Sequence, residues 1–71
     1  MSIFSDRLIQ LRKEKKLSQS DLAKEIGVSP RTYQAYEYGE REPQVSIFCR
    51  IADFYCVSLD YLAGRSDEAG S

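Results

Sequence analysis

Residues 19–38 read QSDLAKEIGVSPRTYQAYEY and contain two short helical patterns on either side of one glycine. Ser18 is a good N-cap for the first pattern, and Asp21 stands three residues later, as in a capping box with a shorter acid. Gly27 follows the last apolar residue of this pattern, where a helix can end in a left-handed conformation. Ser29-Pro30 then supplies a second N-cap and a first helical residue with a fixed φ. The stretch therefore predicts two helices joined by a turn of about three residues, which is a helix-turn-helix.

The second of these helices has two faces of different chemistry at the helical period. One side carries Tyr33, Tyr36 and Glu37. The other side carries Arg31, Gln34, Ala35 and Tyr38. In the DNA major groove an arginine pairs with guanine, a glutamine pairs with adenine, and a small side chain leaves room for a thymine methyl group. This second side favours base recognition, although solvated polar residues on an exposed helix would give the same pattern.

The run LSQSDLAKEIGVSPRTYQAYEYGEREP at 17–43, followed by IADFYCVSLDYLAGRS at 51–66, resembles the lambda-repressor-like (Xre-type) helix-turn-helix family. The resemblance covers residues 4–65. It implies an all-α, compact five-helix DNA-binding domain over residues 1–65, with the helix-turn-helix at 19–38. Residues 66–71 have the composition of a flexible C-terminal tail. The implied function is that of a phage-repressor-type transcriptional regulator, with the recognition helix at 29–38 in the major groove of an operator.

The resemblance also implies which residues contact DNA. The positions that match the base-contacting set of the family are Ser29, Pro30, Arg31, Thr32, Gln34 and Ala35. The candidates for phosphate contact are Gln19, Tyr38, Arg41 and Arg12. Pro30 stands where relatives often carry a polar base-contacting residue, so it can offer only shape and apolar contact. Glu40 and Glu42 flank Arg41 and would be repelled by the same phosphates.

The family would join Arg12 to Glu37 by a salt bridge that orients the recognition helix. Two unrelated surface charges are the alternative. Glu37 falls on the inward side of its helix, where an unpaired carboxylate would be costly, so we expect the pair. Tyr33 is an aromatic residue where the family mostly buries an aliphatic one, and we expect it in the core rather than facing DNA.

Apolar stripes predict the remaining helices. The first begins at Ser2 or Ser5 and ends near Lys15, and another begins at Val45. Cys56 stands where a Gly or Asn C-cap is usual, which predicts a positive φ at this residue. The core predicted from these stripes comprises Phe4, Leu8, Leu11, Leu17, Leu22, Ala23, Ile26, Val28, Tyr33, Tyr36, Val45, Phe48, Ile51, Ala52, Val57, Leu59 and Leu62.

The last predicted helix begins after Ser58 and carries more apolar surface than so short an element can bury beneath itself. The residues concerned are Val57, Leu59, Tyr61 and Leu62. We therefore predict a homodimer through this surface. A two-fold dimer would bind a palindromic operator with half-sites about 34 Å apart.

The composition limits the other classes of function. The chain has 71 residues, 42% hydrophobic and 30% charged, which suits one small globular domain. Its net charge of −1 argues against a uniformly basic surface, but basic residues at 12–16 precede the helix-turn-helix and could make a locally positive region. No run approaches the ~18 apolar residues of a membrane span, and no signal-peptide pattern is present, so we expect a cytoplasmic protein without membrane contact.

The sequence offers little material for chemistry. It has no histidine, and Cys49 and Cys56 would lie about 10 Å apart on one helix, too far for a disulfide. We expect reduced thiols, no metal, no cofactor, no small-molecule ligand and no enzymatic activity. The competing hypothesis is an antitoxin or another protein-interaction module of a regulatory complex.

Overall fold

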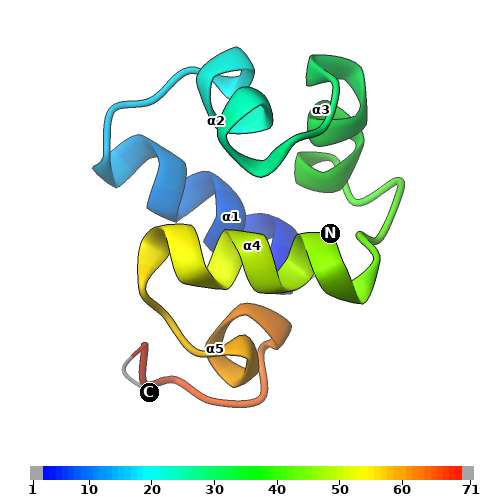
Figure 1. Cartoon of the computed structure of the whole chain (residues 1–71). Coiled ribbons are helices and arrows are strands. Elements are labelled where there is room, and N and C mark those ends of the chain that lie inside the picture. Colours follow the sequence, from blue (N-terminus) through cyan, green and yellow to red (C-terminus); the bar gives the residue numbers. More distant parts are fainter. Residues whose placement is uncertain (1–2, 70–71) are drawn as a thin grey trace.

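The computed structural model describes residues 3–69, which form five α-helices and no strand. The helices are α1 (Ile3–Glu14), α2 (Gln19–Ile26), α3 (Pro30–Glu37), α4 (Val45–Tyr55) and α5 (Leu59–Ala63). The predicted all-α, five-helix architecture is confirmed. Figure 1 shows α2 and α3 together at one end of the molecule, α1 and α4 across the middle, and α5 with the C-terminal segment at the other end.

The start of α1 was predicted at Ser2 or Ser5. Ser2 lies outside the described residues, and Ser5 is not the start because the helix already includes Ile3. Ser5 is buried instead, and its hydroxyl donates to the carbonyl oxygen of Tyr36 at 2.8 Å. This side chain therefore links α1 to the end of α3.

The caps of the helix-turn-helix follow the sequence closely. The Ser18 hydroxyl accepts from the amide of Asp21 at 3.0 Å, and the Asp21 carboxylate accepts from the amide of Ser18 at 3.4 Å. Gly27 ends α2 at φ 79°, a left-handed conformation that disfavours side chains. Ser29 caps α3, and Pro30 is its first residue. Only Val28 and Ser29 follow the C-cap glycine before α3 begins, which accounts for the abrupt change of direction between the two helices.

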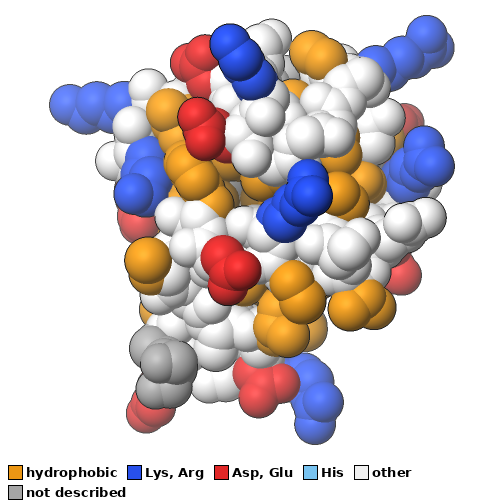
Figure 2. All heavy atoms as spheres, in the orientation of Figure 1, with side chains coloured by type: hydrophobic (Ala, Val, Ile, Leu, Met, Phe, Trp, Pro, Cys, Tyr) orange, Lys and Arg blue, Asp and Glu red, His pale blue; other side chains and the backbone are white. Residues whose placement is uncertain are grey.

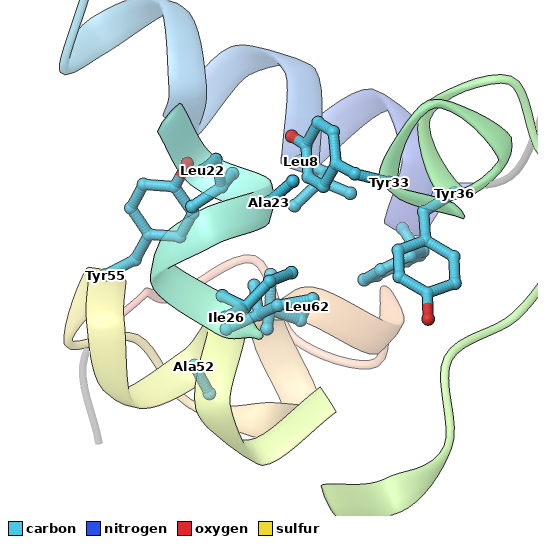
Figure 3. Packing of buried hydrophobic residues seen from close by; sticks show 11 residues of the cluster. Leu8, Leu22, Ala23, Ile26, Tyr33, Tyr36, Ala52, Tyr55 and Leu62 are labelled. Carbon is cyan, nitrogen blue, oxygen red and sulfur yellow. The ribbon is translucent and has the colours of Figure 1, made fainter. Parts of the chain in front are cut away.

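The core is built around α2, which lies between α1 and α4 in Figure 3. The buried hydrophobic side chains are Phe4, Leu8, Leu22, Ala23, Ile26, Tyr33, Tyr36, Ile51, Ala52, Tyr55 and Leu62. Tyr55 was missing from the predicted core. Two predicted core residues were wrong, because Val45 is 78% exposed and Leu59 is 45% exposed. Each is the first residue of its helix, so no preceding helical turn packs beside it.

The segment after α5 is attached to α1 by Arg7. The guanidinium donates to the carbonyl oxygens of Tyr61 and Ser66, contacts the Asp67 carboxylate at 3.2 Å, and lies 4.0 Å from the centre of the Tyr61 ring. The amide of Ser58 also donates to the carbonyl oxygen of Ala69 at 3.0 Å. Residues 66–69, the described part of the predicted tail, thus contact both α1 and α5. No helix in the described range is long and apolar enough to cross a membrane.

Candidate nucleic-acid interface

The outward face of α3 carries the residues that were predicted to read bases. Ser29, Pro30 and Arg31 are exposed, and Thr32, Gln34 and Ala35 are half-buried. The Ser29 hydroxyl accepts from the Thr32 amide at 3.1 Å and donates to the Thr32 hydroxyl at 2.9 Å, so these two side chains hold each other. Within residues 3–69, Arg31 makes no hydrogen bond or ion pair, and its guanidinium is free to meet a ligand.

Tyr33 lies on the opposite face and is fully buried, as predicted. Its hydroxyl makes no hydrogen bond within the described part of the chain. Burial is the main cause that raises the pKa of Tyr33 well above its ordinary value, and it also raises the pKa of Tyr55 to about 12. Both hydroxyls therefore stay neutral at physiological pH. Figure 3 shows the two side chains on either side of α2, Tyr33 from α3 and Tyr55 from α4.

A polar network ties α3 to α1 and α2. Arg12 donates from Nε to Glu37 at 2.6 Å, from Nη2 to Glu37 at 3.2 Å, and from Nη1 to the carbonyl oxygen of Leu17 at 2.9 Å. Gln19 donates from Nε2 to Glu37 at 2.9 Å, and Gln34 donates from Nε2 to the Gln19 oxygen at 3.2 Å. The expected Arg12–Glu37 salt bridge is therefore present in the structure. The link from Gln19 to Gln34 was missed, since these residues lie on different helices and no periodic pattern relates them.

Glu37 is 2% exposed, yet it remains ionised. Burial alone would raise the pKa of its carboxyl, and this is the largest single effect. Hydrogen bonds from Arg12 and Gln19 outweigh burial and hold the Glu37 pKa below its ordinary value. The pairing with Glu37 in turn raises the pKa of Arg12. The carboxylate is thus a permanent acceptor at neutral pH.

The predicted phosphate contacts lie in different settings. Gln19 is the first residue of α2, where backbone N–H groups favour an anion. Tyr38 is 59% exposed at the end of α3, and Arg41 is exposed in the loop that follows. Arg12 is mostly buried, and each of its three nitrogens bonds within the protein, so it has little left to offer a phosphate.

Charge is mixed over the surface. Figure 2 shows Lys and Arg side chains projecting around the outline of one face, with Asp and Glu side chains between them. In residues 3–69 no group of His, Cys, Asp and Glu could hold a metal ion, and Cys49 and Cys56 are free thiols. The positive φ predicted for Cys56 is observed at 56°.

The model of one helix-turn-helix family matches residues 8–62. The chain belongs to this helix-turn-helix family. It is 43% identical over 67 residues to the uncharacterized HTH-type transcriptional regulator YqaE of Bacillus subtilis (strain 168), covering 93% of this chain and 58% of YqaE. It is 37% identical over 65 residues to the cryptic phage CTXphi transcriptional repressor RstR of Vibrio cholerae, covering 92% of this chain and 59% of RstR. The helix-turn-helix chain thus spans less than two thirds of these relatives.

The fold of the chain is also similar to that of a solved repressor structure. The crystal structure of the P22 c2 repressor protein in complex with a synthetic operator aligns with a TM-score of 0.85 and 27% identity. The alignment covers 93% of this helix-turn-helix chain and all of that one.

Proposed function

We propose that this chain is the DNA-binding part of a phage-repressor-type transcriptional regulator, with α3 entering the major groove of a double-stranded operator. The observation that carries the proposal is the outward face of α3. There Arg31 is exposed and makes no hydrogen bond or ion pair among the described residues, while Glu37 on the inward face of the same helix is paired with Arg12. A free bidentate donor on a rigid helix is what base recognition needs. The operator complex of the structurally similar P22 c2 repressor supports the proposal.

Each contact then has a distinct role. Arg31 would pair with guanine, and Gln34 would pair with adenine. Gln19, Tyr38 and Arg41 would contact phosphates, which position the protein without reading sequence. Arg12 would act through Glu37, as an orienting residue, more than through phosphate. A regulator of this kind would work in the cytoplasm and would carry out no catalysis.

The test compares Arg31→Ala with Arg65→Ala, an exposed arginine beyond α5 at the other end of the molecule. Each variant is titrated on an operator selected from random duplex DNA and on a copy whose candidate G·C pair is replaced. We expect Arg31→Ala to lose about 1 to 3 kcal/mol on the selected operator and little on the altered copy. Arg65→Ala should leave the ratio of the two affinities at the parent's value, because Arg65 lines the hollow between α4 and α5 and is not on the face of α3. An equal loss on both DNAs would make Arg31 a backbone contact.

The regulator would bind as a homodimer on a palindromic operator. Two of the four residues predicted for the dimer surface pack within the chain itself: Leu62 is fully buried, and the Tyr61 ring lies against Arg7. Leu59 remains exposed, and it lines a shallow surface hollow between α4 and α5 together with Val45. The apolar surface that a partner could cover is therefore centred on Leu59 and Val45, with Val57 half-buried beside the core.

The same apolar surface favours a second candidate function, that of an antitoxin or another protein-interaction module. Figure 2 shows hydrophobic side chains at the surface over the start of α4 and near α5, away from α3. A toxin or another partner could occupy this surface while α3 remains free. Co-purification of a different protein in fixed ratio from the native host would favour this function over a homodimer.

A further inference from the structure

Gln19 connects the buried carboxylate to the recognition face through both ends of its amide. Its Nε2 donates to Oε1 of Glu37 at 2.9 Å, and its Oε1 accepts from Nε2 of Gln34 at 3.2 Å. Gln34 is half-buried on the outward face of α3, and Glu37 is 2% exposed on the inward face. The side chains of Glu37, Gln19 and Gln34 form a hydrogen-bond relay from the interior to the surface that would meet DNA.

The direction of this line is set at its buried end. An ionised carboxylate can only accept hydrogen bonds, and Arg12 keeps Glu37 charged through contacts at 2.6 and 3.2 Å. Gln19 must therefore turn its NH₂ group toward Glu37, which places its oxygen toward Gln34. Gln34 must donate to that oxygen from its own NH₂ group. A half-turn of either amide would bring two oxygens, or two NH₂ groups, face to face.

We infer that Glu37, acting through Gln19, fixes the orientation of the Gln34 amide and so selects adenine at the base that Gln34 contacts. Gln34 keeps its carbonyl oxygen and one N–H for DNA, because its other N–H is held by Gln19. This acceptor and donor match N6 and N7 of adenine. The inference rests on the proposed DNA-binding function, and it makes Gln19 and Glu37 positioning residues.

Guanine is the base that the fixed orientation rejects. Its major-groove edge presents two acceptors, N7 and O6. With one N–H committed to Gln19, the Gln34 amide can donate to only one of them, and its oxygen would lie against the other. A glutamine free to rotate would not carry this penalty, so the relay makes a general polar contact selective.

The test uses Gln19→Met, which keeps the length of the side chain and removes the relay. Gln10→Met is the matched control, because Gln10 is an exposed residue of α1 that bonds only to Glu14 among the described side chains. The target base pair is the one whose preference disappears in Gln34→Ala. Affinities are measured on the selected operator and on a copy with that A·T pair changed to G·C.

We expect the parent and Gln10→Met to favour the A·T operator by about 5-fold to 150-fold, the range of one bidentate base contact. Gln19→Met should reduce this preference to within about 3-fold, below that range. In a Gln34→Ala background, Gln19→Met should cause no further change in preference, because the amide that Gln19 orients is then absent. In the free parent protein, the Gln34 side-chain amide protons should exchange with solvent more slowly than those of the exposed Gln10.

Different failures have different meanings. If selection from random duplex DNA enriches no sequence, both the proposed function and this inference are wrong. If an operator is selected but Gln19→Met lowers affinity for both DNAs by the same factor, Gln19 is only a phosphate contact and the inference alone falls. Gln34 amide protons that exchange with solvent as fast as those of Gln10 in the parent protein would overturn the inference as well, even if the Gln19→Met chain did not fold.

Discussion

Glu37 helps to fix the position of α3 against α1 and α2. A buried carboxylate is tolerated only when its partners replace water, and Glu37 has Arg12 from α1 and Gln19 from α2. The pair contributes little net stability relative to an apolar alternative, but removing one partner leaves the other uncompensated. Its value is therefore positional, because these bonds can form only when α1, α2 and α3 meet in one arrangement.

The same residue should give the domain an acid-sensitive stability. The folded-state pKa of Glu37 lies below the ordinary value of 4.5, so its contribution is fully present above pH 4.5 and is lost as pH falls through the folded pKa. Urea unfolding from pH 7 to pH 3 should show Glu37→Gln less stable by roughly 3 to 5 kcal/mol at pH 7, with the deficit shrinking toward pH 3. Glu25→Gln, at an exposed position of α2, is the control and should follow the parent. A deficit that stays constant with pH would show that Glu37 does not carry the charge of the pair.

At the scale of the element, α4 shows how a helix can end with an unfavourable residue. Cys56 adopts φ 56° and ψ 42°, and its amide donates to the carbonyl oxygen of Asp53 at 3.2 Å. The left-handed conformation satisfies the last turn of α4 and directs the chain into α5, but it is strained for any residue with a Cβ. Gly27 and Gly64 perform the same task without that strain.

Replacing this cysteine should stabilise the domain. Cys56→Gly is expected to raise the free energy of unfolding by about 1 kcal/mol, because glycine adopts this left-handed conformation without strain. Losing the Cys56 side chain costs little, since it is exposed. Cys49→Gly is the matched control in the interior of α4, where glycine should lower stability instead. Thermal unfolding followed by circular dichroism measures both. Equal destabilisation by both changes would show that the Cys56 backbone leaves the left-handed region in solution.

At the scale of the whole molecule, the proposed DNA-binding face and the proposed partner surface lie toward different ends. The helix-turn-helix lies at one end, and α5 with residues 66–69 lies at the other (Figure 1). Arg7 of α1 donates to the carbonyl oxygen of Ser66 and so attaches this second end to α1. Leu59 and Val45 are exposed near that second end. A partner covering them would leave α3 free, so assembly and DNA recognition can occur together.

A change on this surface should therefore separate assembly from recognition. Leu59→Asp is expected to weaken self-association and the cooperativity of operator binding, because a charge would be buried between two copies. The affinity of a single copy for one half-site should stay near that of the parent. Sedimentation velocity and titrations on full and half operators make the comparison, with Asp53→Asn, an exposed position of α4, as the control. Unaltered sedimentation and cooperativity would place the dimer surface elsewhere.

Local chemistry made much of the fold readable in the sequence. The capping serines, Gly27 and Ser29-Pro30 act on their own neighbours, so the two helices and the turn could be predicted with nearly the observed limits. The inward position of Tyr33 followed from helical periodicity, and the positive φ of Cys56 followed from its place after α4. The Arg12–Glu37 pair came from the family resemblance together with the cost of an unpaired inward carboxylate.

Only the tertiary structure decided which apolar residues are covered and which polar residues meet. Val45 and Leu59 fit their helical stripes but lie at helix starts that no neighbour covers, while Leu62 is enclosed. The contact of Gln19 with Gln34 joins two helices whose relative placement depends on packing throughout the core. Periodicity specifies the face of a helix on which a residue lies, whereas burial and pairing depend on what other helices place against that face.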